Sequence, residues 1–524
     1  MDERRRITDH LFAHTIKPEC KRVKFSYIAS PTLVAPLRAA DGDSVAPGLP
    51  WPMDTSPERF DLLLVGTGQA TGTLLAGLPD DARVAVAEGG AIGGTCVNTG
   101  CTPSKTLVAS ARVAHLARRA GAYGLATGRV GVDFAAAMAR MNDLRHAHRE
   151  GLTRTLAEKP NVTLVRGWAR FVGPRTLRVG DRTLTARRVV LDVGARAAEP
   201  RIPGLADVPW LDNARLLDLE RLPEHLLIVG GGYVALEFGQ VFRRFGADVT
   251  VVEIADRILG REDEDVAAAV REILEREGVR FEVGREVARV APQGDGVALH
   301  LADGRELRGS HLLVAAGRRP NSDGLDLERA GVASDERGHV TVDDHTRTSA
   351  EGVYAVGDVN GRGAFTHTSV HDAQVLLDQL RSEGAAPRPA SARGGPAGAP
   401  RTIGERDPVY ALYTDPPLGR VGMGEAQARA TGRRVLRAVM PMRDVARAQE
   451  MGETQGLVKL LTDADSDRIL GAAVLGVHGD EVVGLFALAM RAGMTTEAFR
   501  RVVLPHPTVG ELMPFVLDRL APVD

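Results

Sequence analysis

The sequence predicts an α/β protein in which two similar strand–turn–helix units precede a smaller α+β domain. Residues 59–66 form a short apolar stretch that runs into G-T-G-Q-A-T, and residues 225–232 repeat the design before Y-V-A. About twenty residues after each turn, a second apolar stretch ends in an acidic residue, Glu88 or Glu253. Apolar strands that alternate with helical segments indicate parallel sheets.

Length and composition limit the function classes. A chain of 524 residues has room for roughly three or four domains. Its hydrophobic content of 44% and charged content of 26% are typical of globular proteins. The net charge of -2 argues against nucleic acid or an acidic membrane surface as the main partner. We find no apolar run long enough to span a bilayer. Only three cysteines indicate a reducing compartment, so we expect a cytoplasmic protein without a membrane partner.

Residues 1–58 are predicted to be a disordered N-terminal extension. Residues 1–24 are basic but lack the apolar core of a signal peptide, and residues 39–57 are rich in Gly, Pro, Asp and Ser. Cys20 is alone in this part of the chain, which predicts no ligand role for it. Met53 lies just before the first strand and is an alternative start of the protein.

The first glycine turn has the spacing of a dinucleotide-binding fingerprint. Gly66 provides the tight turn, and Gly68 lets the backbone approach a pyrophosphate at a helix N-terminus. Thr71 stands at the third position of G-x-G-x-x-G, with Gly72 next. Glu88 is placed to bind ribose hydroxyls. Taken alone, this pattern also fits an ordinary strand–turn–helix.

Residues 93–105, G-G-T-C-V-N-T-G-C-T-P-S-K, hold a cysteine pair, Cys96 and Cys101. Pro103 precedes a helical run over residues 104–119, so both thiols are predicted at a helix N-terminus, which favours thiolate. A zinc half-site is an alternative, but zinc requires four ligands and no second cysteine pair exists. A structural disulfide is another, but so short a loop gains little stability. We therefore expect a reactive pair and no metal site.

The second glycine turn predicts a nicotinamide cofactor. Gly230, Gly232 and Ala235 fill the three fingerprint positions, and the next strand ends at Glu253. An acid there suits the free 2′-hydroxyl of NADH and repels a 2′-phosphate, so NADH is favoured. Arg257 follows closely, as does Arg261, and these two cations leave NADPH open.

Together these motifs resemble the FAD-dependent class-I pyridine-nucleotide–disulfide oxidoreductases, over residues 60 to about 520. The redox motif is most similar to the mercuric-reductase branch; dihydrolipoamide dehydrogenase and glutathione reductase are relatives. The resemblance implies FAD at the first turn, Cys96 as the interchange thiol and Cys101 as the thiol against the flavin. It implies that Lys105 lies near the flavin ring with Thr95 beside the pair, and that Glu237 pairs with Lys105.

The resemblance also assigns the remaining cofactor residues. Asp358, at the end of the apolar stretch 353–358, matches the aspartate that binds the ribityl chain. Gly317 lies in the segment that returns to the FAD-binding domain, and Ala169 completes the expected cofactor-binding set. Two nearby histidines, His367 and His371, are interpreted as exposed or capping residues because of their loop position. Residues 162–193 are expected to form a small antiparallel sheet.

The C-terminal sequence L-P-H-P-T-V-G-E-L-M matches the family pattern H-P-T-x-x-E. It implies that His506 crosses to the interchange thiol of the partner subunit as acid–base catalyst and that Glu511 orients its ring. A His-Pro turn without a catalytic role is the alternative. No cysteine follows Cys101, so the C-terminal cysteine pair of mercuric reductases is missing.

These expectations give an α/β chain with two Rossmann-like dinucleotide-binding domains, one for FAD and one for NAD(P), and a C-terminal α+β dimerisation domain. The boundaries are 1–58 extension, 59–198 FAD, 199–317 NAD(P), 318–383 FAD/central, 384–407 low-complexity linker and 408–524 interface. We expect a homodimer with shared active sites that passes electrons from NAD(P)H through FAD and the Cys96–Cys101 disulfide to a small disulfide, metal ion or other acceptor. The alternatives are a dihydrolipoamide dehydrogenase or low-molecular-weight disulfide reductase, and a nucleotide-binding redox sensor without turnover.

Overall fold

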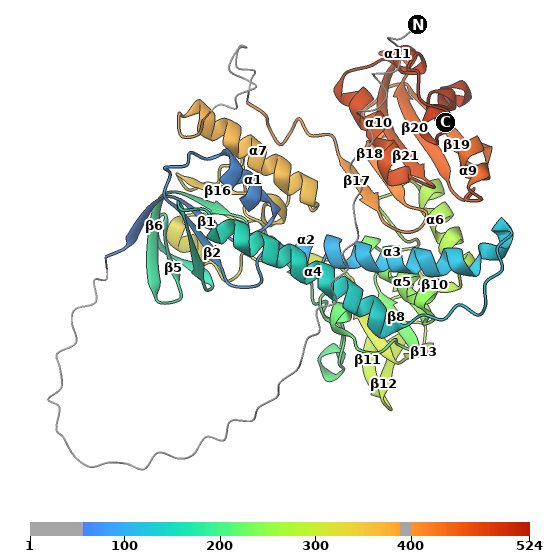
Figure 1. The fold of residues 1–524 in the computed structure, drawn as a ribbon, viewed down its shortest axis with the longest axis horizontal. Coiled ribbons are helices and arrows are strands. Elements are labelled where there is room, and N and C mark those ends of the chain that lie inside the picture. The colour runs from blue at the N-terminus through green and yellow to red at the C-terminus, as the bar shows by residue number, and fades with distance from the viewer. Residues whose placement is uncertain (1–55, 388–399, 524) are drawn as a thin grey trace, which may run out of the picture. The chain divides into compact units, whose positions relative to one another are not determined.

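The computed structural model describes residues 56–387 and 400–523. Almost all of the predicted extension and the middle of the predicted linker lie outside this part of the chain. The described residues form one compact unit that contains four larger sheets, of seven, four, three and six strands (Figure 1). Within this part, no helix is long and apolar enough to cross a membrane.

The first sheet has the strand order β3-β2-β1-β6-β5-β4, and β16 pairs with β6. Strands β1, β2, β3, β6 and β16 run parallel to one another, so their carboxyl ends share one edge. The strands are β1 Glu58–Val65, β2 Val84–Glu88, β3 Val162–Arg166, β4 Ala169–Gly173, β5 Thr176–Val179, β6 Arg182–Leu191 and β16 Val353–Ala355. Helices α1 (Gln69–Gly77) and α7 (Thr366–Ser382) pack together over it (Figure 1).

The expected small antiparallel sheet at residues 162–193 is only partly correct. Strand β3 pairs parallel to β2 in the first sheet, and β4, β5 and β6 form an antiparallel meander that extends that sheet. Long helix α4 (Phe134–Ala157) returns the chain to the start of the sheet, so β3 enters in the parallel direction. Turns at residues 174–175 and 180–181 connect the strands of this meander.

The second unit is a four-stranded parallel sheet in the order β10-β9-β8-β14. Its elements are β8 His225–Val229, α5 Tyr233–Phe245, β9 Asp248–Glu253, α6 Glu264–Arg276, β10 Val279–Val283 and β14 His311–Val314. A three-stranded antiparallel sheet precedes β14, formed by β11 Val287–Gln293, β12 Gly296–Leu301 and β13 Glu306–Gly309. A short ladder of β7 (Ala195–Ala197) with β15 (Arg318–Pro320) connects this unit to the first sheet.

The C-terminal domain is a six-stranded sheet in the order β17-β18-β21-β20-β19-β22, antiparallel throughout. Its strands are β17 Val409–Leu412, β18 Leu418–Gly422, β19 Val435–Pro441, β20 Leu457–Asp463, β21 Arg468–Leu475 and β22 Ala521–Pro522. Its helices are α8 Glu425–Ala430, α9 Ala446–Glu450, α10 Gly479–Arg491 and α11 Thr496–Arg500.

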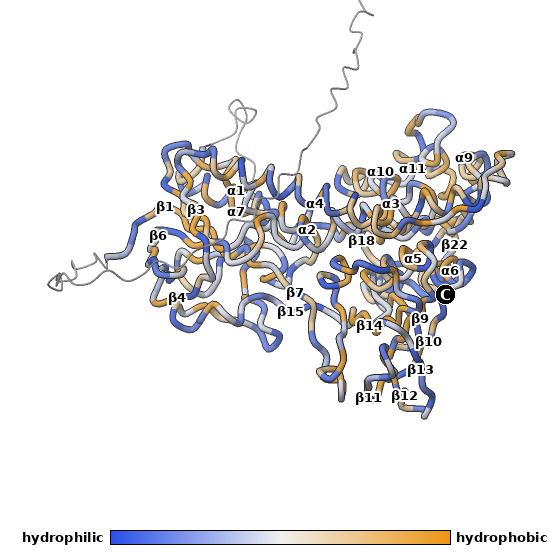
Figure 2. The backbone as a smooth tube through the Cα atoms, turned by 60° about the horizontal axis from the view of Figure 1, so that its bottom comes forward, coloured by the Kyte–Doolittle hydropathy of each residue, from blue (hydrophilic) through white to orange (hydrophobic). Residues whose placement is uncertain are grey.

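The first sheet has a hydrophobic cluster on each face, because its parallel strands are apolar on both faces. Figure 2 shows this as hydrophobic segments of the tube along the strands. The cluster around the second sheet also takes in residues of α3, α4 and the C-terminal sheet. The flanks of the predicted linker are packed: Ala386 and Ile403 are buried, and Arg401 forms an ion pair with Asp378 at 2.7 Å. At the two flanks of the predicted linker, Ala386 therefore packs with residues of α7 and Arg401 is held to α7 by its ion pair.

Candidate active site

The first glycine turn lies at the carboxyl edge of the first sheet, between β1 and α1. Gly66 has a φ of +102°, and a Cβ there would lie 2.3 Å from the Asp192 carbonyl oxygen, so only glycine fits. At the end of β2, the Glu88 carboxylate accepts hydrogen bonds from the Thr67 amide at 3.0 Å and hydroxyl at 2.5 Å. Its other oxygen accepts from the Gly90 amide at 2.7 Å. The structure therefore brings Gly66, Gly68 and Glu88 together.

The redox loop is attached directly to this turn. Gly93 and Gly94 both have positive φ, and a Cβ on Gly94 would lie 3.2 Å from the Gly68 Cα. The Gly93 amide donates to the Thr67 hydroxyl at 3.0 Å. Close approach of the two backbones therefore requires the paired glycines of the redox motif.

The two cysteines lie on two successive helices, the short α2 (Gly94–Asn98) and the long α3 (Cys101–Arg118), and not on one helix N-terminus as expected. Cys96 is inside helix α2, while Cys101 is the first residue of α3. The predicted helix therefore begins three residues earlier than Ser104, with Pro103 still in its first turn, where a missing N–H is tolerated. Both thiols are free, half-buried at Cys96 and exposed at Cys101.

The thiols have opposite acid strengths. A hydrogen bond from the Cys96 thiol lowers the pKa of Cys101 to about 6, with further lowering by the Thr366 hydroxyl and the Lys105 charge. The same contact and burial raise the pKa of Cys96 well above its usual range. At neutral pH the pair therefore holds one proton on Cys96 and a thiolate on Cys101.

Thr366 is a site residue that the sequence did not reveal. It begins helix α7, and its Oγ1 lies 3.3 Å from the Cys101 Sγ. The two residues are 265 positions apart, so no local pattern connects them.

Lys105 is held by residues from two other parts of the chain. Its Nζ lies 2.7 Å from the Glu237 carboxylate on α5, which confirms the predicted pairing. The other Glu237 oxygen accepts from the Tyr413 amide at 2.9 Å, and the Lys105 ammonium lies 4.5 Å from the centre of the Tyr413 ring. Glu237 is 6% exposed, so a buried carboxylate connects Lys105 to the backbone at Tyr413.

The second glycine turn repeats the first. Gly230 has a φ of +107°, and a Cβ there would lie 2.6 Å from the Ala315 carbonyl oxygen. A Cβ on Gly232 would meet no atom within 4 Å, so open space faces the N-terminus of α5. The Glu253 carboxylate accepts from the Gly231 amide at 2.5 Å and the Ala255 amide at 2.8 Å. The acid thus lies directly beside the glycine turn.

The other predicted cofactor residues lie on segments next to these turns. Asp358, in a turn after β16, forms an ion pair with Arg318 at 2.6 Å, and Gly317 precedes that arginine with a φ of +131°. Thr95 donates to the Ala195 carbonyl at 3.4 Å. Ala169 begins β4, two residues after Gly167. The Gly167 amide donates to the Glu88 carbonyl at 3.0 Å, so the start of β4 lies close to the carboxyl end of β2.

The C-terminal residues His506 and Glu511 form hydrogen bonds with each other and none with the two cysteines, among the residues that the structure describes. The His506 Nδ1 is 2.9 Å from Glu511 Oε2, and the imidazole is 77% exposed. Among the described residues, the hydrogen-bonding partner of this ring is Glu511 and neither cysteine. The His506–Pro507 peptide bond is cis.

The two histidines after Phe365 are held by protein contacts. His367 Nε2 lies 2.5 Å from the Val409 carbonyl, and its ring stacks on Phe365 with the centroids 5.5 Å apart. Burial lowers the pKa of both His367 and His371. His367 is exposed, as expected, whereas His371 is partly buried, and these contacts agree with a structural interpretation of both.

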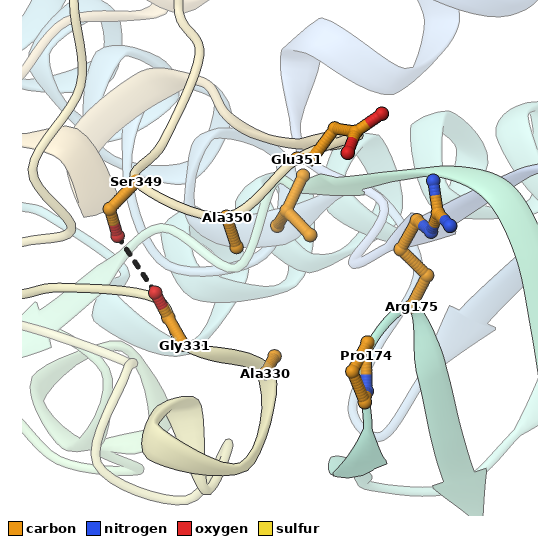
Figure 3. A pocket seen from close by; sticks show the side chains of 8 residues that line it. Pro174, Arg175, Ala330, Gly331, Ser349, Ala350 and Glu351 are labelled. Carbon is orange, nitrogen blue, oxygen red and sulfur yellow. Dashed lines mark hydrogen bonds between the residues drawn. The ribbon is translucent and has the colours of Figure 1, made fainter.

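Two hollows contain none of the predicted site residues. One, of about 280 Å³, lies between the β4–β5 turn at Pro174 and the loops around Gly331 and Ser349, whose hydroxyl donates to the Gly331 carbonyl (Figure 3). A larger one, of about 890 Å³, lies between α6 and the C-terminal sheet, next to Arg420 and Lys459. Its charges are mutually paired, since Asp263 contacts both cations.

Comparison with known protein families identifies the family to which this chain belongs. Residues 60–373 match the family model of the pyridine nucleotide-disulphide oxidoreductases, and residues 409–515 match its dimerisation domain. The chain belongs to this family. The predicted family, fold class and enzyme class are therefore confirmed, and the enzyme is an FAD-dependent oxidoreductase of the disulfide reductase type that uses a pyridine nucleotide.

Several relatives cover most of this oxidoreductase. RclA of Escherichia coli (strain K12) is 33% identical over 462 residues, which cover 86% of this chain and 97% of RclA. A mercuric reductase of Bacillus cereus is 31% identical, covering 86% of this chain and 70% of the relative. A dihydrolipoyl dehydrogenase of Cupriavidus necator is 32% identical, with 87% and 97% covered. The solved structure of RclA, titled an HOCl-induced flavoprotein disulfide reductase, covers 88% of this chain and 99% of that chain at 32% identity, with a TM-score of 0.77. Its Cu(II) complex gives a TM-score of 0.78.

The first glycine turn fits FAD on the chemistry of its own groups. A helix N-terminus and crowded glycines suit a pyrophosphate, and Glu88 lies about twenty residues beyond them, as an acid for a ribose should. The exposed Cys101 thiol lies at the start of the neighbouring helix α3, where a flavin ring is required for disulfide reduction. One feature, the buried carboxyl of Asp192 beneath Gly68, was not predicted.

Proposed function

We propose that this enzyme is a homodimer that oxidises NADH and reduces a small thiol-reactive acceptor through Cys96 and Cys101. The observation that carries the proposal is the placement of the cysteine pair beside Lys105 and Thr366, whose Oγ1 lies 3.3 Å from the Cys101 Sγ. The Cys96 thiol and this environment lower the pKa of Cys101, and the Cys101 thiol and burial raise the pKa of Cys96. Bound FAD supplies the two-electron transfer between the nicotinamide and the disulfide. A nucleotide-binding sensor without turnover does not require a thiolate and a protonated thiol held in this way.

In the reductive step, the Cys96–Cys101 disulfide receives two electrons and one proton. The S–S bond breaks, Cys101 becomes the thiolate and Cys96 the thiol. Lys105 and the Thr366 hydroxyl stabilise the negative charge on Cys101, and the hydrogen bond between the sulfurs retains the proton on Cys96. In the reduced enzyme, the attacking residue Cys96 is therefore protonated.

Attack on an acceptor requires a base for the Cys96 proton. We assign that role to His506 of the partner subunit, because in one chain the described contacts of its ring lead to Glu511 and not to the cysteines. The bond to Glu511 fixes Nδ1, which leaves Nε2 to take and return a proton. The family's dimerisation domain, matched by residues 409–515, supports a two-fold assembly in which each active site is shared.

We propose NADH as the electron donor. The Glu253 carboxylate lies at the second glycine turn, bound to two backbone amides, where it would repel a 2′-phosphate and accept from a ribose hydroxyl. We also propose a cytoplasmic location, because a cycling thiol pair needs a reducing compartment.

The acceptor is proposed to be a soft metal ion or a small disulfide. RclA forms a Cu(II) complex, and mercuric reductases are among the relatives, which supports a thiophilic metal. Dihydrolipoyl dehydrogenases are equally similar, which supports a disulfide as the second candidate. In the described residues no group of three or more ligands could hold a resident metal, so a metal would be a substrate at Cys96.

The test is anaerobic oxidation of NADH by the purified enzyme with Cu(II), Hg(II), glutathione disulfide or lipoamide as the acceptor. We expect turnover with at least one acceptor and its loss in Cys96→Ser, while the first reduction of the cofactor by NADH remains. Turnover that survives in Cys96→Ser would show that the thiol pair is bypassed. No turnover with any acceptor, although NADH reduces the cofactor, would favour the sensor.

A further inference from the structure

Asp192 is a buried carboxyl directly beneath the first glycine turn. It follows β6 at the carboxyl edge of the sheet and is 4% exposed. Its Oδ2 accepts from the Thr71 amide at 3.0 Å and from the Thr71 hydroxyl at 2.9 Å. Thr71 occupies the third fingerprint position, which is otherwise glycine or alanine. Threonine at this position of the fingerprint is therefore explained by its hydrogen bonds to the buried Asp192 carboxyl.

The free side of this carboxyl faces the cofactor cradle. An ideal Cβ on Gly68 would lie 2.5 Å from Asp192 Oδ1, and one on Gly357 would lie 3.7 Å from the same oxygen. Asp192 thus lies between the turn assigned to the pyrophosphate and the turn that carries Asp358. An ionised carboxyl in this position would repel a pyrophosphate across a medium of low dielectric constant.

The surrounding charges do not neutralise it. Glu88 from β2 and Asp358 from the turn after β16 both disfavour its ionisation. Asp358 is itself paired with Arg318 of β15, and Asp372 of α7, whose Oδ2 accepts from the Gly357 amide, is paired with Arg406. From α1, only the Thr71 dipoles and the helix N-terminus favour the charged form.

Burial prevails over these favourable dipoles. It raises the pKa of Asp192 to about 7, against the lowering by the Thr71 hydroxyl and amide. At neutral pH, the protein without cofactor therefore contains both forms of this carboxyl, and a nearby anion shifts the balance toward the neutral form.

We propose that FAD binding takes up one proton at Asp192, so that a neutral carboxylic acid lies beneath the bound pyrophosphate. The proposal rests on the placement of FAD at the first glycine turn. FAD affinity is then constant below the pH at which Asp192 ionises in the free protein. Above that pH the affinity falls, by up to tenfold for each pH unit. The enzyme would lose its cofactor most readily in alkaline conditions.

The test uses calorimetry on the full chain after removal of FAD, in two buffers of different ionisation enthalpy. At pH 8 we expect the wild type to take up nearly one proton per FAD, and Asp192→Asn to take up none and to bind FAD with little pH dependence. Asp61→Asn, an exposed aspartate on β1 of the same sheet, should bind as the wild type does.

Thr71→Ala gives a second, directional test. It removes a hydrogen bond that favours the charged carboxylate, so the pH at which affinity begins to fall should move upward. FAD binding without proton uptake in the wild type, which needs no variant, would overturn the proposal and leave the FAD site intact. Proton uptake that persists in Asp192→Asn would also overturn it. Failure to bind FAD at all would instead defeat the site assignment.

Discussion

Lys105 and Glu237 form a 2.7 Å ion pair between α3 and α5, two helices that belong to the two different nucleotide-binding units. Glu237 is buried and also binds the Tyr413 amide, so the position of the ammonium is fixed from both sides. This fixed cation lies close enough to Cys101 to lower the pKa of its thiol.

Removal of that cation should change the acidity of the thiol. In Lys105→Met, the pKa of Cys101 should rise from about 6, because a favourable charge is lost. The thiolate is present above this pKa and is lost as the pH falls through it, so its midpoint should move to higher pH. The midpoint is measured from alkylation rates of the reduced protein by iodoacetamide, with Lys159→Met as control. An unchanged midpoint would show that Lys105 does not act on the thiol.

The two cysteines should give different spectra. Anaerobic addition of one equivalent of NADH should produce a long-wavelength charge-transfer absorbance in the wild type. Cys96→Ser should retain this absorbance and Cys101→Ser should lose it, because Cys101 carries the thiolate. The opposite pattern would exchange the two assignments, and no absorbance in the wild type would argue against a thiolate beside the flavin.

Glu253 should determine the choice of nicotinamide cofactor. Glu253→Ala removes both the acceptor for a ribose hydroxyl and the repulsion of a 2′-phosphate. We expect the ratio of kcat/KM for NADH to that for NADPH to fall about tenfold, the value of one lost charged hydrogen bond. Glu264→Ala, at the start of α6, is the control. A wild type that strongly prefers NADPH would contradict this interpretation.

A shared active site predicts recovery of activity in mixed dimers. Cys96→Ser and His506→Ala should each be nearly inactive, with a rate loss of about 10²–10⁴ for the missing acid–base group. A dimer of one subunit of each kind has one site with both defects and one site with neither, so activity should return. Mixed dimers that form but remain inactive would show that each subunit uses its own histidine.

The buried ion pairs around Asp415 should contribute strongly to stability. Asp415 is 7% exposed and pairs with Arg244 at 2.5 Å and with Arg112. Asp415→Asn removes one of the two carboxylates that pair with each guanidinium, since Arg244 keeps Glu277 and Arg112 keeps Glu453. The lost charge-assisted hydrogen bonds should lower the free energy of unfolding by about 1.5–3 kcal/mol. Asp465→Asn, which removes an exposed pair with Arg434, should change the denaturation midpoint far less. Equal losses in the two variants would contradict the proposed role of burial.

Local sequence patterns predicted the parts of the site that lie within short segments. The glycine turns, Glu88, Glu253 and the cysteine pair each stand in a short strand–turn–helix segment, where spacing along the chain determines their position. Thr366 and Tyr413 were missed because their roles depend on packing of segments hundreds of residues apart. Asp192 gave one usable signal, a threonine in a fingerprint position that usually lacks a hydroxyl. The parallel pairing of β3 was missed because strand direction is set by the preceding helix and not by the strand's own residues.

One face of α5 also has a consequence for how such enzymes can be recombined. Its residues Glu237, Gln240 and Arg244 all hold the segment 413–415, and Arg112 of α3 reaches the same segment. Helix α3, helix α5 and segment 413–415 belong to three different domains, and they therefore share one network of buried hydrogen bonds and ion pairs. A chimera that exchanges the nicotinamide-binding module between relatives must also exchange the residues of segment 413–415 that bind α5. Otherwise buried charged groups at this contact will lack their partners.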